Sequence, residues 1–176
     1  MPAFPRAELE EMLRRWLAAN EAAEKAGDWK PMAEFYTADA EYTWNLGPNE
    51  DFIARGRQQI RDWVLGTEME GLEGWEYPYD KVLIDEKQGE MVAFWRQVAP
   101  AKRPDGTRHE IRGVGGSWFR YAGNYQWAEQ KDFFDFGNAM ACFMDLIQAD
   151  QLSPAMRKRI ERAMAGEIMP GHVKRS

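Results

Sequence analysis

The spacing of apolar residues predicts helices near the start of the chain. Apolar residues recur at helical intervals from Leu9 to Ala23, and Gly27 is typical of a helix C-terminus. We therefore expect a helix over residues 6–26. Asp28 is placed to cap a short second helix that follows it.

After the second helix the pattern changes toward strands. Residues 41–44 predict a short strand, residues 45–55 are polar and turn-rich, and Gly56 leads into a third helix. Turn-forming residues separate four later strand-like runs, so we expect an antiparallel meander. These runs cover residues 75–85, 90–99, 109–121 and 125–136. Two helices are expected in the tail, the second beginning at Ser153 and Pro154. Helices followed by a curled sheet indicate an α+β fold.

The last strand carries the most informative residue, Asp132. Strict alternation over residues 125–136 would place Asp132 and Phe134 on one face of the strand and Trp127 and Phe133 on the other. A carboxylate is costly to bury among aromatic side chains. Asp132 must therefore be paired, reach solvent through a cavity, or have a raised pKa that suits proton transfer.

Composition narrows the class of protein. The chain has 176 residues, 44% of them apolar, which fits one domain with a sizeable core. Its 29 acidic and 23 basic side chains give a net charge of −6, which argues against a nucleic-acid partner. A basic leader and a long uncharged apolar run are both missing, so we expect no membrane partner and a cytoplasmic location. The lone Cys142 allows no intrachain disulfide and is expected to be a small buried hydrophobe.

Several short motifs occur in an order known from one superfamily. They are Gly27-Asp28-Trp29, Phe35-Tyr36, Asp39-Ala40-Glu41-Tyr42, Gly56-Arg57-Gln58-Gln59-Ile60 and Gln130-Lys131-Asp132-Phe133-Phe134-Asp135. With them the chain resembles the nuclear transport factor 2-like (NTF2-like) superfamily, and within it the SnoaL-like branch of polyketide cyclases. The resemblance implies a cone in which three N-terminal helices pack on a strongly bent, mixed or antiparallel sheet around an apolar cavity. It also implies chemistry without a metal or an organic cofactor.

The resemblance divides the chain into two parts. Residues 1–140 would form the NTF2-like domain. Residues 141–176 would form a helical extension that packs on the same domain or on a partner subunit.

Asp132 lies where epoxide-hydrolase members of the superfamily keep an acidic residue. Arg96 matches an arginine on a neighbouring strand of those enzymes, but Val98 stands in place of their second acid, so the full triad is absent. An ion pair between Arg96 and Asp132 would hold the carboxylate ionised. Such a pair suits either a general base or a structural salt bridge.

Two further residues are candidates for proton transfer. His109 would be the natural proton shuttle if it faced the cavity, although its place after the turn at residues 104–106 also suits an exposed loop histidine. Tyr42, or alternatively Tyr36, could stabilise an enolate. His172 lies in an end that looks disordered, and with two histidines and one cysteine we expect no metal site.

Aromatic side chains are the expected lining of the cavity, although core packing would explain most of them equally well. The candidates for substrate binding are Tyr36, Trp44, Trp16, Trp95 and Phe134. Arg112 could bind a substrate carboxylate or phenolate, or could stack on the outer face of the sheet.

Two functions remain open at this point. The first is a cofactor-independent isomerase, cyclase, dehydratase or lyase that acts on a small hydrophobic aromatic or polycyclic compound, with Asp132 as base. The second is a non-catalytic module that binds a small ligand or another protein. We also expect a homodimer, because Trp127, Phe133 and Trp95 would make the outer sheet face unusually apolar.

Overall fold

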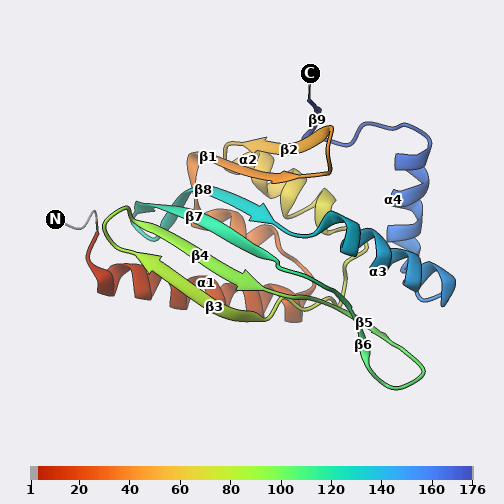
Figure 1. The fold of residues 1–176 in the computed structure, drawn as a ribbon. Coiled ribbons are helices and arrows are strands. Elements are labelled where there is room, and N and C mark those ends of the chain that lie inside the picture. Colours follow the sequence, from red (N-terminus) through yellow and green to blue (C-terminus); the bar gives the residue numbers. More distant parts are fainter. Residues whose placement is uncertain (1–3, 176) are drawn as a thin grey trace.

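The computed structural model describes residues 4–175 and has the predicted α+β fold (Figure 1). Helix α1 (Arg6–Ala26) runs along one face of a large sheet, with Leu9, Met12 and Trp16 buried against it. It ends at Gly27, whose φ of 64° is a left-handed conformation that favours glycine. This helix therefore begins and ends where the apolar spacing predicted.

Short helices, nine strands and two C-terminal helices make up the remainder of the chain. In chain order they are the 3₁₀ helix η1 (Lys30–Phe35), β1 (Tyr36–Asn45), β2 (Glu50–Arg55), α2 (Arg57–Gln59), the π-helical turn η2 (Ile60–Val64), the 3₁₀ helix η3 (Thr67–Met69), β3 (Tyr79–Asp85), β4 (Glu90–Trp95), β5 (Gln97–Lys102), β6 (Arg108–Ile111), β7 (Gly116–Gly123), β8 (Gln126–Phe133), α3 (Phe136–Gln148), α4 (Pro154–Met164) and β9 (His172–Lys174), all within the described residues 4–175. The predicted loop over residues 45–55 is wrong in its second half, which is strand β2.

Seven strands form the main sheet in the order β3-β4-β7-β8-β1-β2-β9. All neighbours are antiparallel except β1 and β8, which are parallel. The meander prediction is wrong where two runs leave this sheet, one after Trp95 and the other between Ile111 and Gly116. Their detached parts pair as the separate hairpin β5–β6, which projects from one end of the molecule (Figure 1).

A β-bulge in β8 overturns the strict alternation expected of that strand. Trp127 pairs with Tyr121 and Glu129 pairs with Arg120, so Ala128 is the extra residue. The bulge turns Trp127 inward, where its ring is fully buried and stacks on Phe119 at 4.6 Å between ring centroids.

The apolar outer face expected of the sheet is correspondingly smaller than predicted. Trp127 and Trp95 are buried, whereas Phe133 is 37% exposed. The grounds for expecting a homodimer are weaker as a result, and the homodimer stays a prediction.

Helices α3 and α4 pack at the end of the sheet remote from the N-terminus (Figure 1). Ser153 caps α4 by accepting the Met156 backbone N–H at 3.2 Å, and Pro154 begins the helix as predicted. Cys142 is buried, also as predicted. A second apolar cluster joins these helices to the β5–β6 hairpin and the loop before β3: Trp75, Ala99, Ile111, Ala139, Cys142, Leu146, Leu152 and Met156.

Within residues 4–175, no helix is both long and apolar enough to cross a membrane.

Candidate active site

A cavity of about 470 Å³ opens between the sheet, α1 and the two C-terminal helices. Its size lies in the range that takes small-molecule ligands. Its wall is mainly apolar and includes the aromatic residues singled out from the sequence: Trp16, Tyr36, Tyr42, Trp44, Trp95 and Phe134. Contact between these residues and a substrate stays a prediction.

Asp132 faces this cavity from β8 and accepts hydrogen bonds from three neutral side chains. Its Oδ2 accepts from the Tyr42 hydroxyl at 2.6 Å, and its Oδ1 accepts from the Ser117 hydroxyl at 2.6 Å and from Gln130 Nε2 at 2.8 Å. The donors are themselves held. Trp95 Nε1 donates to Ser117 Oγ at 2.8 Å, Gln130 Nε2 lies 2.8 Å from Tyr42 Oη, and the Tyr36 hydroxyl donates to Gln130 Oε1. The carboxylate orientation is thus fixed by a connected network.

Strand register explains why these side chains meet. Asp132 pairs with Ser117 across β7 and with Trp44 across β1, while Gln130 pairs with Tyr42. Directly paired residues point to the same face of a sheet, so the four polar groups gather on the cavity side. The predicted cavity-facing orientation of Asp132 is confirmed by its place on the cavity wall.

Burial is the dominant electrostatic effect on Asp132. Loss of solvation raises the pKa of this carboxyl above its ordinary value, while the hydrogen bonds from Ser117, Tyr42 and Gln130 act in the opposite direction. Burial and the nearby Asp132 charge also raise the pKa values of Tyr36 and Tyr42 well above the usual phenol value. Both phenols are therefore held as proton donors.

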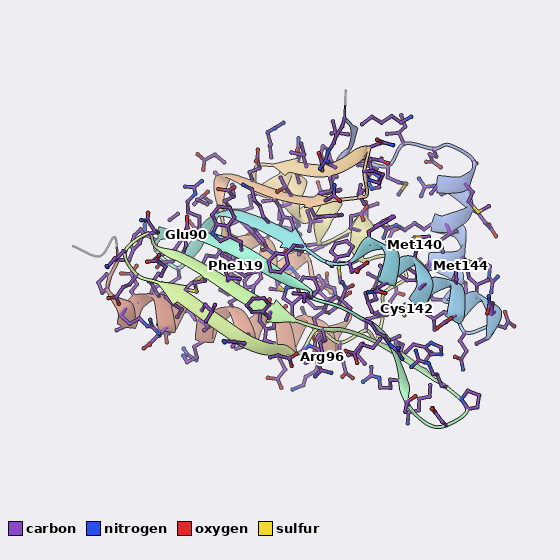
Figure 2. All side chains as sticks on the ribbon, viewed as in Figure 1. Glu90, Arg96, Phe119, Met140, Cys142 and Met144 are labelled. Carbon is purple, nitrogen blue, oxygen red and sulfur yellow. The ribbon has the colours of Figure 1, made fainter. Side chains whose placement is uncertain are left out.

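The expected ion pair between Arg96 and Asp132 is wrong. Arg96 follows the last residue of β4 and lies at the molecular edge (Figure 2), where its guanidinium pairs with Asp80 at 3.1 Å and Glu110 at 3.7 Å. The break between β4 and β5 causes this placement. Arg112 is likewise exposed and absent from the cavity wall, so a substrate contact through it is not supported.

His109 differs from both of its expected placements. It is only 4% exposed, although a loop position was expected, and it is not on the cavity wall. Both ring nitrogens are buried without a hydrogen-bond partner. A role as proton shuttle for Asp132 is therefore not supported by position.

Sequence reasoning missed several residues of the cavity wall, including Tyr77, His172, Glu50 and Glu68. Tyr77 is one of the residues that line the cavity, and its hydroxyl is fully buried with no hydrogen-bond partner. His172, assigned to an end that looked disordered, lies on the cavity wall and begins strand β9. Pro170-Gly171 just before it was the one local turn signal available.

The sequence comparison now identifies the family. The SnoaL-like domain family model matches residues 13–129. The chain belongs to the SnoaL-like family. The match ends inside β8, so it includes Tyr42 and Ser117, whereas Gln130, Asp132 and the C-terminal helices lie beyond it. No curated protein shows significant similarity to this SnoaL-like chain.

Solved structures support the same fold. A candidate SnoaL-like polyketide cyclase from Jannaschia sp. CCS1 is 16% identical with a TM-score of 0.57, and the match covers 77% of this chain and 91% of that one. An NTF2-like protein of unknown function from Burkholderia pseudomallei K96243 is 12% identical with a TM-score of 0.53, and the match covers 73% of this chain and 95% of that one. TerC, co-crystallised with polyporic acid, is 15% identical with a TM-score of 0.51, and the match covers 76% of this chain and 96% of that one.

Proposed function

We propose that this SnoaL-like protein is a cofactor-independent acid–base enzyme that acts on a small hydrophobic aromatic or polycyclic compound. The observation that carries the proposal is Asp132, a carboxylate in an apolar cavity whose three hydrogen-bond donors are all neutral. A structural carboxylate in such a place is usually paired with a cation. Asp132 instead retains the proton affinity that a general base needs.

The geometry of the carboxylate leaves room for a substrate proton. An ionised carboxylate has about four lone-pair positions, and Asp132 uses two on Oδ1 and one on Oδ2. The remaining position belongs to Oδ2. Because Asp132 lies on the cavity wall, we assign this lone pair to the proton that is removed.

Tyr77 is the donor we assign to the substrate oxygen. Tyr42 already donates to Asp132, so it orients the base, whereas the Tyr77 hydroxyl has no partner in the protein. Burial raises the pKa of Tyr77, which keeps its proton in place. A phenol of this kind can hydrogen-bond to a carbonyl oxygen and stabilise the negative charge that develops there.

The proposed first step is common to the reaction types still open. Asp132 takes a proton from a carbon next to a carbonyl, the C–H electron pair forms a C=C bond, and the carbonyl π pair moves to oxygen as an enolate beside Tyr77. Return of the proton to another carbon gives isomerisation. Loss of a leaving group gives elimination, and attack on a second carbonyl of the same molecule gives ring closure.

The experiment that tests this proposal follows deuterium exchange by mass spectrometry. Wild type, Asp132→Asn and Asp80→Asn would be incubated in deuterated buffer with a panel of aromatic ketones and steroid enones that carry a C–H next to a carbonyl. Asp80 is an exposed carboxylate that pairs with Arg96, so it provides the same substitution outside the cavity.

We expect a mass change with wild type and with Asp80→Asn. The rate of this change should be lower by about 100-fold or more in Asp132→Asn. Equal activity in all three proteins would exclude Asp132 as the base. Raised melting temperatures with ligands that undergo no mass change in any protein would favour a binding module.

A further inference from the structure

Two buried side chains lie one hydrogen bond further from the cavity carboxylate than its direct partners. Trp95 Nε1 donates to Ser117 Oγ at 2.8 Å, and the Tyr36 hydroxyl donates to Gln130 Oε1. Ser117 and Gln130 in turn donate to Asp132. All four side chains belong to residues that are at most 9% exposed. The hydrogen bonds therefore form two short chains that begin at Trp95 and Tyr36 and end at Asp132.

The direction of each hydrogen bond in these chains follows from the chemistry of its ends. An indole nitrogen can only donate, so Ser117 Oγ receives the Trp95 hydrogen and turns its own hydrogen toward Asp132. An amide oxygen can only accept, so the Tyr36 hydroxyl must donate to Gln130. The opposite end of that amide, Nε2, then faces Asp132 Oδ1 at 2.8 Å. Both chains end in a donor that points at the carboxylate.

This arrangement stabilises the ionised form of Asp132 and offers no acceptor to the proton of its neutral form. Ser117 Oγ already receives the Trp95 hydrogen and lies 3.2 Å from Gln130 Nε2. Gln130 Oε1 is turned away toward Tyr36. Without the Trp95 hydrogen the Ser117 hydroxyl could rotate, and without the Tyr36 hydroxyl the Gln130 amide could turn over. Either change would give a protonated carboxyl an acceptor.

We propose that Trp95 and Tyr36 are positioning residues for the base Asp132. Trp95 holds the Ser117 hydroxyl as a donor to this carboxylate. Tyr36 holds the Gln130 amide in the same way. The inference deepens the proposed function and rests on it, because a base must be ionised before it can take a proton. The role uses the polar atoms of both outer side chains and leaves their rings for contact with a substrate.

Titration of the Asp132 carboxyl carbon by NMR, on the full chain and without substrate, tests the role of Tyr36. Tyr36→Phe lets the Gln130 amide turn over, so the pKa of Asp132 should rise. Its acid dissociation constant should fall about three- to tenfold, the effect of one net hydrogen bond. Tyr79→Phe is the matched control, because the Tyr79 hydroxyl also lines the cavity but accepts from the Trp16 indole at 2.9 Å. It should leave the pKa of Asp132 unchanged.

A double-mutant cycle shows whether Tyr36 acts through Gln130. Once Gln130→Leu has removed the amide, the Tyr36 hydroxyl has no group left to orient toward Asp132. Tyr36→Phe should then add no further rise to the pKa of Asp132. An equal rise with and without Gln130 would mean that Tyr36 acts directly on the charge, and it would contradict the positioning role.

The Trp95 chain is tested by the same titration of Trp95→Phe, which should also raise the pKa of Asp132. Trp16→Phe is the control, because the Trp16 indole lines the cavity but donates to a phenol outside the network.

The wild-type protein gives a second measurement that needs no substitution. The Trp95 indole proton and the Tyr36 hydroxyl proton should shift over the pH range in which Asp132 titrates, because hydrogen-bonded groups polarise one another. The Trp16 indole proton should stay constant over that range. This comparison tests both chains even if a variant does not fold.

Separate results would overturn each half of the proposal. An unchanged Asp132 pKa in Tyr36→Phe, or a rise matched by Tyr79→Phe, would exclude Tyr36; the same results for Trp95→Phe and Trp16→Phe would exclude Trp95. Outer protons that stay constant while Asp132 titrates would exclude both. Because no turnover is involved, a failed exchange experiment leaves the titration readable, and an unchanged titration leaves the exchange experiment unaffected.

Discussion

Asp132 and Glu68 are two carboxylates on the wall of one cavity, and their partners are of opposite kinds. Asp132 is held by a phenol, a hydroxyl and an amide, all neutral. Glu68 is held by the Arg159 guanidinium and by His172. Neutral donors fix the direction of a carboxylate while leaving its burial cost unbalanced, whereas a cation cancels that cost. The first arrangement suits a group that must exchange a proton, and the second suits a group that must stay in place.

Removal of the Glu68 charge should have the largest effect on stability. Glu68→Gln leaves the Arg159 guanidinium, which is mostly buried, without its carboxylate, and the free energy of unfolding should fall by about 2 kcal/mol. Urea unfolding followed by circular dichroism would measure it. Glu50→Gln is the matched control, because Glu50 also contacts His172 but is more exposed, and it should cost less than about 1 kcal/mol. Equal losses in the two variants would contradict the contrast between a buried and an exposed pair.

Loss of the Tyr77 hydroxyl should affect catalysis and leave stability intact. Tyr77→Phe removes an oxygen with no partner in the protein, so no internal hydrogen bond is lost, while the rate of the exchange reaction should fall by about tenfold or more. Tyr79→Phe is the control, because the Tyr79 hydroxyl accepts the Trp16 indole N–H at 2.9 Å. That variant should lose stability by about 1 kcal/mol. An unchanged exchange rate in Tyr77→Phe would show that Tyr77 takes no part in the proposed reaction.

A single methyl group at Gly171 should loosen strand β9 and leave the Asp132 network unchanged. Gly171 has a φ of +83°, and a Cβ there would lie 2.5 Å from Phe52 Cε2. Gly171→Ala should therefore weaken β9 docking by about 1–2 kcal/mol, seen as faster hydrogen exchange of β9 amides. Gly166 has a similar positive φ of +80°, and a Cβ there would have no atom within 4 Å. Gly166→Ala therefore shows the effect of backbone strain without a clash. The clash with Phe52 is refuted if both variants loosen β9 to the same degree.

The smallest effect is expected from Asp132→Asn on stability, and its dependence on pH is diagnostic. Burial raises the folded-state pKa of Asp132 above 3.8, so folding favours the protonated carboxyl. Its contribution to stability is complete below the unfolded pKa and is lost as pH rises through the folded pKa. The stability of Asp132→Asn relative to wild type should therefore increase over this window and then stay level. A relative stability that decreases over the same pH range would mean that the folded-state pKa is depressed.

Local sequence patterns predicted the elements whose signals are themselves local. Apolar spacing located α1, Ser153-Pro154 located the start of α4, and the isolated carboxylate on a strand drew attention to Asp132. Each of these signals depends on residues within a few positions of one another.

The errors came from interactions between distant residues. The extra residue Ala128 in β8 is defined only by the pairing of that strand with β7, and it reverses the face of Trp127. Arg96 leaves the sheet because β4 ends at Trp95, so its partners became Asp80 and Glu110. Neither the pairing of β8 with β7 nor the end of β4 at Trp95 can be predicted from the local sequence.

His172 shows the same limitation at the candidate site. It reaches the cavity only because β9 pairs with β2, more than a hundred residues earlier in the chain. Tyr77 was overlooked because a lone tyrosine in a predicted strand carries no sign that its hydroxyl will lack a partner. Burial of polar atoms is a property of the assembled fold.

An NMR titration of the Asp132 carboxyl carbon, with the resonance assigned by its absence from Asp132→Asn, tests most directly whether this residue has the proton affinity of a base. If burial outweighs the three neutral hydrogen bonds, the carboxyl should titrate with a pKa above 3.8. A pKa at or below 3.8 would contradict the proposed role, since Asp132 would then be a carboxylate stabilised by its network, with a proton affinity no greater than that of an exposed aspartate.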